Sequence, residues 1–523
     1  MSKMPSIMSH DFSRVPRAEI PRSSFDRSHG LKTTFDSGYL VPIFIDEALP
    51  GDTFNLNMTG FARLATPLHP FMDNIFMNTF FFFVPYRLIW NNFQRFMGEQ
   101  PNPGDSTDFV VPQIVGPGYG EGSIYDYLGI PTIVPCTHSA LPLRAYNLIY
   151  NEWFRDQNLQ NAVVVPKNDG PDNALDYTLK RRGKRHDYFT SSLPWPQKGE
   201  AVDIPLGTTA PVMGIGMASA GSFNQPNIVV TETGGVGNTY VDGQFTAAAN
   251  GIAVKGTGST PEIYVDLSNA ASATINQLRQ AFAIQKLYER DARGGTRYTE
   301  IIRAHFNVTS PDARLQRPEY LGGGQSPVHA YSVPQNSGTG AYTPTPQGNL
   351  AAYATSNLSG HGFSKSFTEH GVIIGLLSVR ADLNYQQGLN RMWSRRTKFD
   401  YYWPALSHIG EQAVLNKEIY YQNTVADDEA WGYQERFAEY RYKPSQITGA
   451  MRSSAALSLD TWHLAQDFGA LPALNDAFIQ DAPPIARVIA VPSEPQFIFD
   501  AYFKLRCARP MPLYGVPGMI DRF

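Results

Sequence analysis

Apolar and polar positions alternate at both ends of the chain in the pattern of β-strands. Phe54, Leu56 and Met58 alternate with polar residues, which is the two-residue period of a strand with one face in water. A second apolar stretch covers residues 75–84. The clearest alternation lies near the other end, where one face would carry Phe497, Phe499, Ala501, Phe503, Leu505 and Cys507. We therefore expect strands from opposite ends of the chain to pair in one sheet.

A continuous apolar run, GVIIGLLSV, covers residues 371–379. Such a run is typical of a strand that is covered on both faces. Aromatic residues make up 12% of the chain, and 44 Gly and 39 Pro residues interrupt it throughout. This combination favours many short strands and ordered loops over long helices. The predicted fold class is all-β, with a few short helices.

Two segments have the pattern of helices that pack against a core. Pro142 lies in the first turn of the segment 141–158, where proline is favoured. Thr274 and Gln277 have the spacing of a capping box before a second helix, and Gly294 is placed to end it. The apolar stripe of the first helix would comprise Leu143, Tyr146, Tyr150 and Trp153.

The chain has 523 residues, which exceeds one ordinary compact domain, so we expect two domains or one domain with long insertions. Residues 1–32 are predicted to form an extended basic arm, because Pro5, Pro16 and Pro21 oppose regular structure; an ordinary frayed terminus is the alternative. The main domain would cover 33–523. Residues 201–275, rich in Gly, Ala, Thr and Val, would form a surface insertion. Residues 322–360, rich in Gly, Ser, Thr and Pro, would form an irregular loop.

Charge and cysteine usage narrow the function classes. The formal net charge is −4 at pH 7, so the chain is not a polycation that coats nucleic acid by bulk charge. Cys136 and Cys507 lie far apart without a CxxC context, which argues against a zinc site and fits assembly in a reducing cytoplasm. We expect no secretory signal, since the first residues contain no apolar core segment. We also expect no membrane insertion, since the apolar run near residue 80 is interrupted by Pro85 and Arg87.

The sequence carries no HExxH, GxxxxGK[ST], GxSxG or strand-to-helix GxGxxG motif. We therefore expect no enzymatic activity, no cofactor and no metal site. A carbohydrate-binding or carbohydrate-hydrolysing β-sandwich remains the alternative, because paired catalytic carboxylates need no local motif.

Two basic runs are candidate binding segments. The first could neutralise phosphates beside its flanking aromatic residues, or else lie in a solvated loop or clamp a carboxylate at a subunit contact. The second mixes Arg with aromatic residues, which favours a subunit interface. The first run comprises Lys180, Arg181, Arg182, Lys184 and Arg185, and the second includes Arg391, Trp393, Arg395 and Arg396.

Both ends of the chain could also make contacts. The N-terminal arm carries several arginine side chains, and the C-terminal tail carries several large apolar side chains. The arm residues are Arg14, Arg17, Arg22 and Arg27, and the tail residues are Met511, Leu513, Tyr514 and Met519.

Long strings of mixed aromatic, proline and charged residues resemble the major capsid proteins of gokushoviruses, small icosahedral phages with single-stranded DNA. The matching strings cover both ends and the middle of the chain, whereas 201–275 and 322–360 match poorly. They are FDRSHGLKTTFDSGYLVPIFIDEALPGDTF at 25–54, FARLATPLHPFMDNIFMNTFFFFVPYRLIWNNFQRFMGEQ at 61–100, LPLRAYNLIYNEWFRDQNLQ at 141–160, LRQAFAIQKLYERDARGGTRYTEIIRAHFNVTSPDARLQRPEYLGGG at 278–324, and FIFDAYFKLRCARPMPLYGVPGMIDRF at 497–523.

The resemblance implies an eight-stranded antiparallel jelly roll with long loop insertions. It also implies a T=1 icosahedral shell of sixty copies around a circular single-stranded DNA genome, formed in the host cytoplasm and ending in the virion. By position and composition, 201–275 would be the insertion that projects at the threefold axes and contacts a host surface receptor. A separate small basic protein would supply much of the neutralising charge during DNA packaging. The arginines of the arm and the basic run at 180–185 would then be candidates for contact with DNA or the inner shell, and the C-terminal tail a candidate tie across a subunit boundary.

Overall fold

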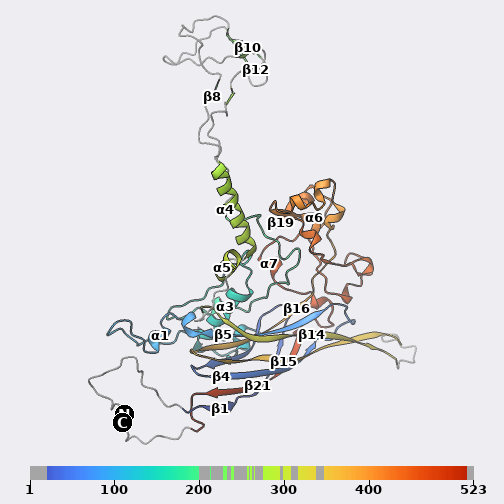
Figure 1. Ribbon diagram of the computed structural model, residues 1–523. Helices are drawn as coiled ribbons and strands as arrows, with labels where there is room; N and C mark the ends of the chain where they lie inside the picture. The colour runs from blue at the N-terminus through green and yellow to red at the C-terminus, as the bar shows by residue number, and fades with distance from the viewer. Residues whose placement is uncertain are drawn as a thin grey trace, which may run out of the picture. The chain divides into compact units, whose positions relative to one another are not determined.

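The computed structural model describes residues 21–199, 275–294, 298–307, 316–336 and 347–514, together with six short strands between residues 212 and 265 (Figure 1). The chain divides into two compact units. The first unit combines Met1–Pro196 with Ser310–Phe523, and the second is Gln197–Thr309.

The first unit is built on one large antiparallel sheet of nine strands. Its order is β1-β21-β4-β15-β14-β5-β16-β3, and β2 also pairs with β21. The pairing of β21 with β4 joins the two ends of the chain, as the alternating patterns predicted. The strands are β1 Ser23–Asp26, β2 His29–Phe35, β3 Val41–Ala48, β4 Thr53–Leu64, β5 Ile75–Pro85, β14 Glu319–Pro334, β15 Leu350–Ser366, β16 Gly371–Ala381 and β21 Phe497–Arg509.

The sheet curls because its two middle strands change partners along their length. The first part of β14, from Glu319 to Val328, pairs with β5, and the remainder, from His329 to Pro334, pairs with β15. Beyond Thr355, β15 pairs with β4 instead. The two halves of the sheet, β21-β4-β15 and β14-β5-β16-β3, can therefore face each other across a shared core.

This core confirms the strand faces that the sequence predicted. Phe54, Leu56 and Met58 of β4 are buried, as are the alternate residues of β21 from Phe497 to Cys507. They belong to one cluster with the inward side chains of the other half, including Phe81 of β5 and Ile373 of β16. The predicted all-β class is thus correct for the main sheet.

β5 and β16 are covered on both faces, which accounts for their continuous apolar sequences. Phe82 and Ile374 point away from the shared core into a second cluster, built with helix α3 (Leu141–Ile149) and the segment before it. In Figure 1 α3 lies on the opposite side of β5 from β4 and β21. The prediction of a doubly covered strand at 371–379 is confirmed.

Two predictions about irregular segments are wrong. Residues 322–360 were expected to form an irregular loop, but 322–334 and 350–360 lie in β14 and β15. The arm over 1–32 was expected to be extended and without regular structure, but in its last ten residues β1 and the beginning of β2 pair with β21. In both cases hydrogen bonds to a neighbouring strand outweigh the weak strand preference of Gly, Ser and Pro.

The predicted helices are present with some differences. α3 begins at Leu141 with Pro142 as its second residue, and continues as a π-helical turn over Tyr150–Phe154. In its predicted stripe, Leu143, Tyr146 and Tyr150 are buried, whereas Trp153 is partly exposed. Helix α4 spans Ile275–Gly294 and ends at the predicted glycine; Thr274, half of the predicted capping box, lies outside the described residues.

Several shorter elements complete the two units. In the second unit, three strand pairs join β8 Val212–Met213 with β13 Tyr264–Val265, β9 Ile228–Thr231 with β10 Gly237–Tyr240, and β11 Gly256–Thr257 with β12 Thr260–Pro261; α5 Tyr298–Phe306 follows α4. The remaining elements of the first unit are α1 Phe93–Phe96, β6 Gln113–Gly116, α2 Ile124–Tyr127, β7 Cys136–Ser139, β17 Asn384–Tyr385, β18 Glu411–Leu415, α6 Asn416–Ile419, β19 Ala430–Glu435, β20 Ser445–Gln446 and α7 Asp476–Ile479.

Candidate assembly surface

An exposed aromatic segment follows the short strand β17. Trp393 is 71% exposed, and five other large apolar side chains within ten residues of it are about half exposed. Exposed clusters of this kind are uncommon on monomeric proteins and mark contact sites. We call residues 392–403 the aromatic segment; its exposed apolar side chains are Met392, Trp393, Phe399, Tyr401, Tyr402 and Trp403.

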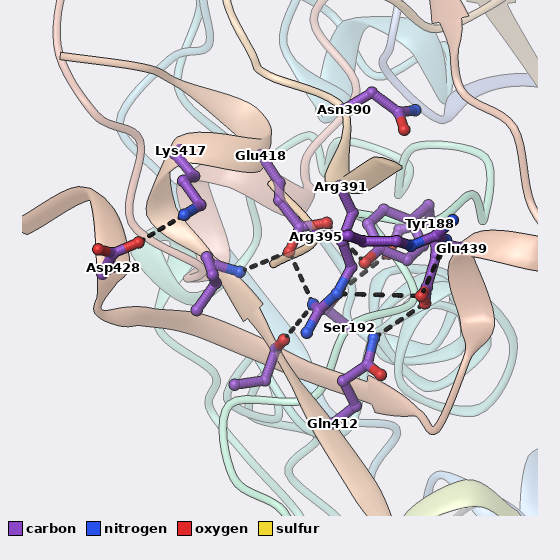
Figure 2. Close-up of polar contacts among 12 residues, drawn as sticks. Tyr188, Ser192, Asn390, Arg391, Arg395, Gln412, Lys417, Glu418, Asp428 and Glu439 are labelled. Carbon is purple, nitrogen blue, oxygen red and sulfur yellow. Dashed lines mark hydrogen bonds and ion pairs between the residues drawn. The ribbon is translucent and has the colours of Figure 1, made fainter. Parts of the chain in front are cut away.

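Arg391 anchors the beginning of the aromatic segment to the core beneath it. Its guanidinium donates hydrogen bonds to the carboxylate of Glu418 at 2.9 Å and to the carbonyl of Ala413 at 2.7 Å. A second carboxylate, that of Glu439, lies 3.9 Å from the Arg391 Nε. Figure 2 shows Arg391 between these two acidic side chains, which come from α6 and from the turn after β19.

Glu418 is the buried centre of this network. Its carboxylate accepts hydrogen bonds from the Tyr188 hydroxyl at 2.8 Å and from the Leu415 backbone N–H at 2.9 Å. Burial raises the pKa of Glu418 above its usual range, against the opposing effect of Arg391. Burial and the neighbouring Glu418 likewise raise the pKa of Tyr188. Arg391 lies near the carboxylates of both Glu418 and Glu439, which makes the buried charges tolerable, although the Oε1 oxygen of Glu439 accepts no hydrogen bond.

Arg395 holds the segment further along. Its guanidinium lies 3.5 Å from Glu439 and over the rings of Tyr440 and Tyr401, at 4.4 Å and 5.2 Å from their centroids. The Trp403 indole N–H donates to the Lys398 carbonyl at 2.7 Å. These contacts hold the backbone of the aromatic segment in one conformation, so less conformational entropy is lost when a partner binds the rings.

The predicted interface residues fall into two groups. Arg391 and Arg395 face inward and position the aromatic segment, whereas Trp393 and Arg396 are exposed. In the C-terminal tail, Met511, Leu513 and Tyr514 are exposed, and Met519 lies outside the described residues. Sequence reasoning missed Glu418 and Glu439, for which the sequence gives no local signal.

The basic run over 180–185 contacts protein along most of its length. Arg181 lies 4.0 Å from the Tyr39 ring centroid and donates to the Asp481 carbonyl. Arg182 lies over Phe80, and Lys184 over Phe478. Arg182 donates a hydrogen bond to the Asn78 side chain at 3.1 Å, and Lys180 donates one to the Thr178 hydroxyl at 2.8 Å. Arg185 forms an ion pair with Asp382 at 2.9 Å. All these contacts lie within the chain itself, which none of the alternatives open from sequence had anticipated.

Burial has a marked effect on the charges of this run. It lowers the pKa of Arg182 to about 9 and that of Lys184 to about 8. It also raises the pKa of Asp481 to about 7, although Arg380 and the basic run oppose that shift. The run therefore holds charges that are costly to keep away from water.

An open hollow of about 460 Å³ lies beside the basic run. Its walls include the aromatic side chains of Phe80, Phe82, Trp153, Phe154 and Tyr320, and the side chains of Arg182 and Arg380 also line it.

The arginines of the N-terminal arm divide between described and undescribed residues. Arg22 donates to the Thr53 hydroxyl at 2.6 Å, and Arg27 forms an ion pair with Asp46 at 2.5 Å. Both therefore contact the sheet. Arg14 and Arg17 lie outside the described residues.

The described residues were also compared with the patterns of metal sites and membrane-spanning helices. No group of three or more His, Cys, Asp or Glu side chains there is placed to hold a metal ion. Cys136 and Cys507 are both free thiols. Among the described residues, no helix has the length and apolar character needed to span a bilayer.

Comparison with known proteins identifies the family. Residues 13–519 match the family model described as "Capsid protein (F protein)". The chain is 51% identical to the capsid protein VP1 of Bdellovibrio phage phiMH2K, over 98% of each chain, and 48% identical to that of Chlamydia phage 1, over 99% of each. It is 38% identical to the capsid protein VP1 of Spiroplasma virus 4, over 98% of this chain and 97% of the relative. The chain therefore belongs to the F-protein family of phage capsid proteins, and its role is that of a structural protein of the virion and not that of an enzyme.

Proposed function

We propose that this protein is the coat subunit of a T=1 icosahedral shell in which sixty copies enclose a circular single-stranded DNA genome. The observation that carries the proposal is the aromatic segment. Its rings are exposed, yet Arg391 and Arg395 hold the backbone beneath them through Glu418 and Glu439. Rigid, exposed aromatic side chains beside Arg are what subunit interfaces favour.

We also propose that the main sheet is an eight-stranded jelly roll. Support comes from the pairing order, in which β2-β21-β4-β15 and β14-β5-β16-β3 form two sets of four joined through β14 and β15. Such an order places sequence neighbours such as β4 and β5 in different sets, as two nested Greek keys require. β1 would then be an additional short strand at one edge.

The contacts of the virion with other molecules are proposals of the same kind. Residues 201–275 would project at the threefold axes and meet a host surface receptor; most of them lie outside the described residues. A separate small basic protein would accompany the DNA, which fits a coat protein whose net charge is −4. Assembly would take place in the host cytoplasm.

Assembly through the aromatic segment can be tested with a triple variant, Trp393→Ser, Tyr401→Ser and Trp403→Ser. These side chains are exposed in the isolated subunit, so their removal should leave folding intact but prevent shell formation, because interface energy is concentrated in a few aromatic residues. Sedimentation velocity and electron microscopy would report shells, and circular dichroism would report folding.

Leu175→Ala supplies a control for that experiment, because Leu175 is also apolar and is 83% exposed. The control should assemble as the unmodified protein does. A folded triple variant that still forms closed shells in normal yield would exclude the aromatic segment as the main contact.

A further inference from the structure

One face of the main sheet has no covering layer among the described residues. Every second residue of β4 and β21 is exposed, in the alternation of a sheet with one side in water. β5 and β16, in the other half of the sheet, are buried on both sides. We call the exposed side of β2, β21, β4 and β15 the open face.

The strand register gathers aromatic rings and cations on the open face. Phe61 of β4 lies opposite Asp500 of β21, two residues from Tyr502, and Phe61 and Tyr502 are 47% and 52% exposed. Such diagonal neighbours lie about 7–8 Å apart. The same register places Arg63 opposite Ile498, Lys504 opposite Asn57, and Arg506 opposite Asn55. Exposed rings, cations and amides therefore alternate over adjacent strands.

The cations of the open face exceed its carboxylates. Asp500 forms an ion pair with Lys32 at 3.1 Å, and Asp26 lies opposite Arg506 on β1. Arg63, Lys504 and Arg506 form no ion pair within the described part of the chain. Hydrogen bonds from Ser28 lower the pKa of Asp26, and the nearby charges of Arg506 and Lys504 lower it further. Four cations, Lys32, Arg63, Lys504 and Arg506, thus face two carboxylates, Asp26 and Asp500, so the open face carries an excess of positive charge.

We propose that the open face binds the single-stranded DNA genome, an inference that rests on the proposed role as a coat around DNA. Phosphates would meet Arg63, Lys504 and Arg506, and unpaired bases would stack on Phe61 and Tyr502. A basic surface with exposed rings is the combination that binds single strands without sequence preference. A second copy that presented the same face would set these cations against each other, and such like-charge contacts are costly, which disfavours a second copy as the occupant.

The basic run over 180–185 does not compete well for this role. The side chains of Arg181, Arg182 and Lys184 lie against protein rings, and Arg185 already has a carboxylate partner. By contrast, Arg63, Lys504 and Arg506 form no ion pair among the described residues, and only Asp26 lies opposite one of them. We therefore place the principal DNA contact on β4 and β21 and not on the basic run.

Phosphate contact can be tested on the unassembled full-length chain with a fluorescein-labelled oligothymidylate. The triple variant Arg63→Gln, Lys504→Gln and Arg506→Gln should bind it more weakly. The slope of log K against log salt should also become shallower by about 2, because each lost phosphate contact on a single strand contributes about 0.7. The matched control Arg279→Gln, Lys286→Gln and Arg290→Gln removes the same charge from exposed positions of α4 and should leave binding and slope unchanged.

Stacking can be separated from apolar contact at Phe61 and Tyr502. Phe61→Leu and Tyr502→Leu keep apolar area but remove the ring, and each should weaken oligonucleotide binding about tenfold. Phe61→Tyr and Tyr502→Phe keep the ring and should bind as the unmodified protein does. If the Leu variants bind normally while melting normally, the rings are not stacking platforms and the proposal is overturned.

Two measurements on assembled particles distinguish this inference from the proposed function: sedimentation reports whether shells form, and the 260/280 nm absorbance ratio reports how much DNA they contain. Shells of the basic triple variant with reduced DNA content would support it. Shells with full DNA content, together with normal oligonucleotide binding by the subunit, would overturn it while leaving the coat role intact. Failure of the unmodified protein to form shells would count against the proposed function, and the oligonucleotide titration would still decide the inference.

Discussion

Arg144 and Asp172 form the most deeply buried ion pair among the described residues, and both side chains are almost inaccessible to water. Two nitrogens of Arg144 donate to the two oxygens of Asp172, at 2.7 and 2.5 Å, and a third donates to the carbonyls of Ile89 and Asn168. The Tyr177 hydroxyl also donates to Asp172. The pair thus joins α3 to the segment before the basic run.

Breaking this pair from one side should be strongly destabilising. Arg144→Met would leave the Asp172 carboxylate buried without a counter-charge, and we expect a loss of about 3–5 kcal/mol in the free energy of unfolding. Urea denaturation of the unassembled subunit would measure it. The double variant Arg144→Met and Asp172→Leu should recover much of the loss; equal stability of the single variant and the unmodified protein would contradict this account.

A buried histidine makes stability depend on pH. His361 of β15 lies between the Thr79 hydroxyl at 2.8 Å and the Ser326 hydroxyl at 3.1 Å, and burial lowers its pKa. The unfolded chain, with a histidine pKa of about 6.5, binds the proton more readily than the folded chain does. The contribution of His361 is therefore present above pH 6.5 and is lost as the pH falls through its lower folded pKa.

We expect the stability difference between pH 7.5 and pH 5 to shrink in His361→Gln, because glutamine does not titrate. Urea denaturation at the two pH values would measure the difference in each protein. An unchanged difference would mean that His361 does not contribute to the acid sensitivity of the fold.

Long-range partners explain why sequence reasoning missed several residues at this scale. The basic run over 180–185 was recognisable from sequence, but Asp481, which lies among its side chains, is about three hundred positions away. The pairing of Arg391 with Glu418 and Glu439 could likewise not be predicted from the sequence. A charged residue in a sequence has no signature that distinguishes a solvated position from a buried, paired one.

At the scale of elements, hydrophobic periodicity predicted the strands whose faces are buried by the core. β4, β5, β16 and β21 follow their predicted segments within a few residues. β14 was misjudged because its GGG sequence is typical of a loop. In the fold, a Cβ added at Gly323 would lie only 2.0 Å from the Thr79 carbonyl oxygen of β5. The glycine is needed for the close approach of two strands, which composition alone cannot reveal.

Gly323→Ala should therefore destabilise the sheet. The added methyl group would meet backbone and force the strands apart, so we expect a loss of about 1–3 kcal/mol. Gly348→Ala offers a comparison near the hairpin end, where an added Cβ meets no atom within 4 Å but the positive φ of 88° adds backbone strain. Thermal unfolding should place Gly323→Ala below both the unmodified protein and Gly348→Ala; an unshifted transition would show that β14 and β5 can separate at little cost.

At the scale of the whole molecule, the chain combines a large covered core with surfaces that stay exposed in the isolated subunit. The aromatic segment and the open face differ in chemistry, since the first is apolar and braced, and the second carries unbalanced cations. Two surfaces of different character suit a subunit that contacts its own copies with one and a genome with the other. The sequence resemblance predicted the coat role, but only the strand register could locate the open face.

Sedimentation velocity of the purified full-length protein over a range of concentrations tests the coat role most directly. The account predicts a concentration-dependent change from free subunits to one fast-sedimenting species with the mass of sixty copies, visible as closed shells by electron microscopy. A protein that remains monomeric at high concentration under native conditions would contradict it.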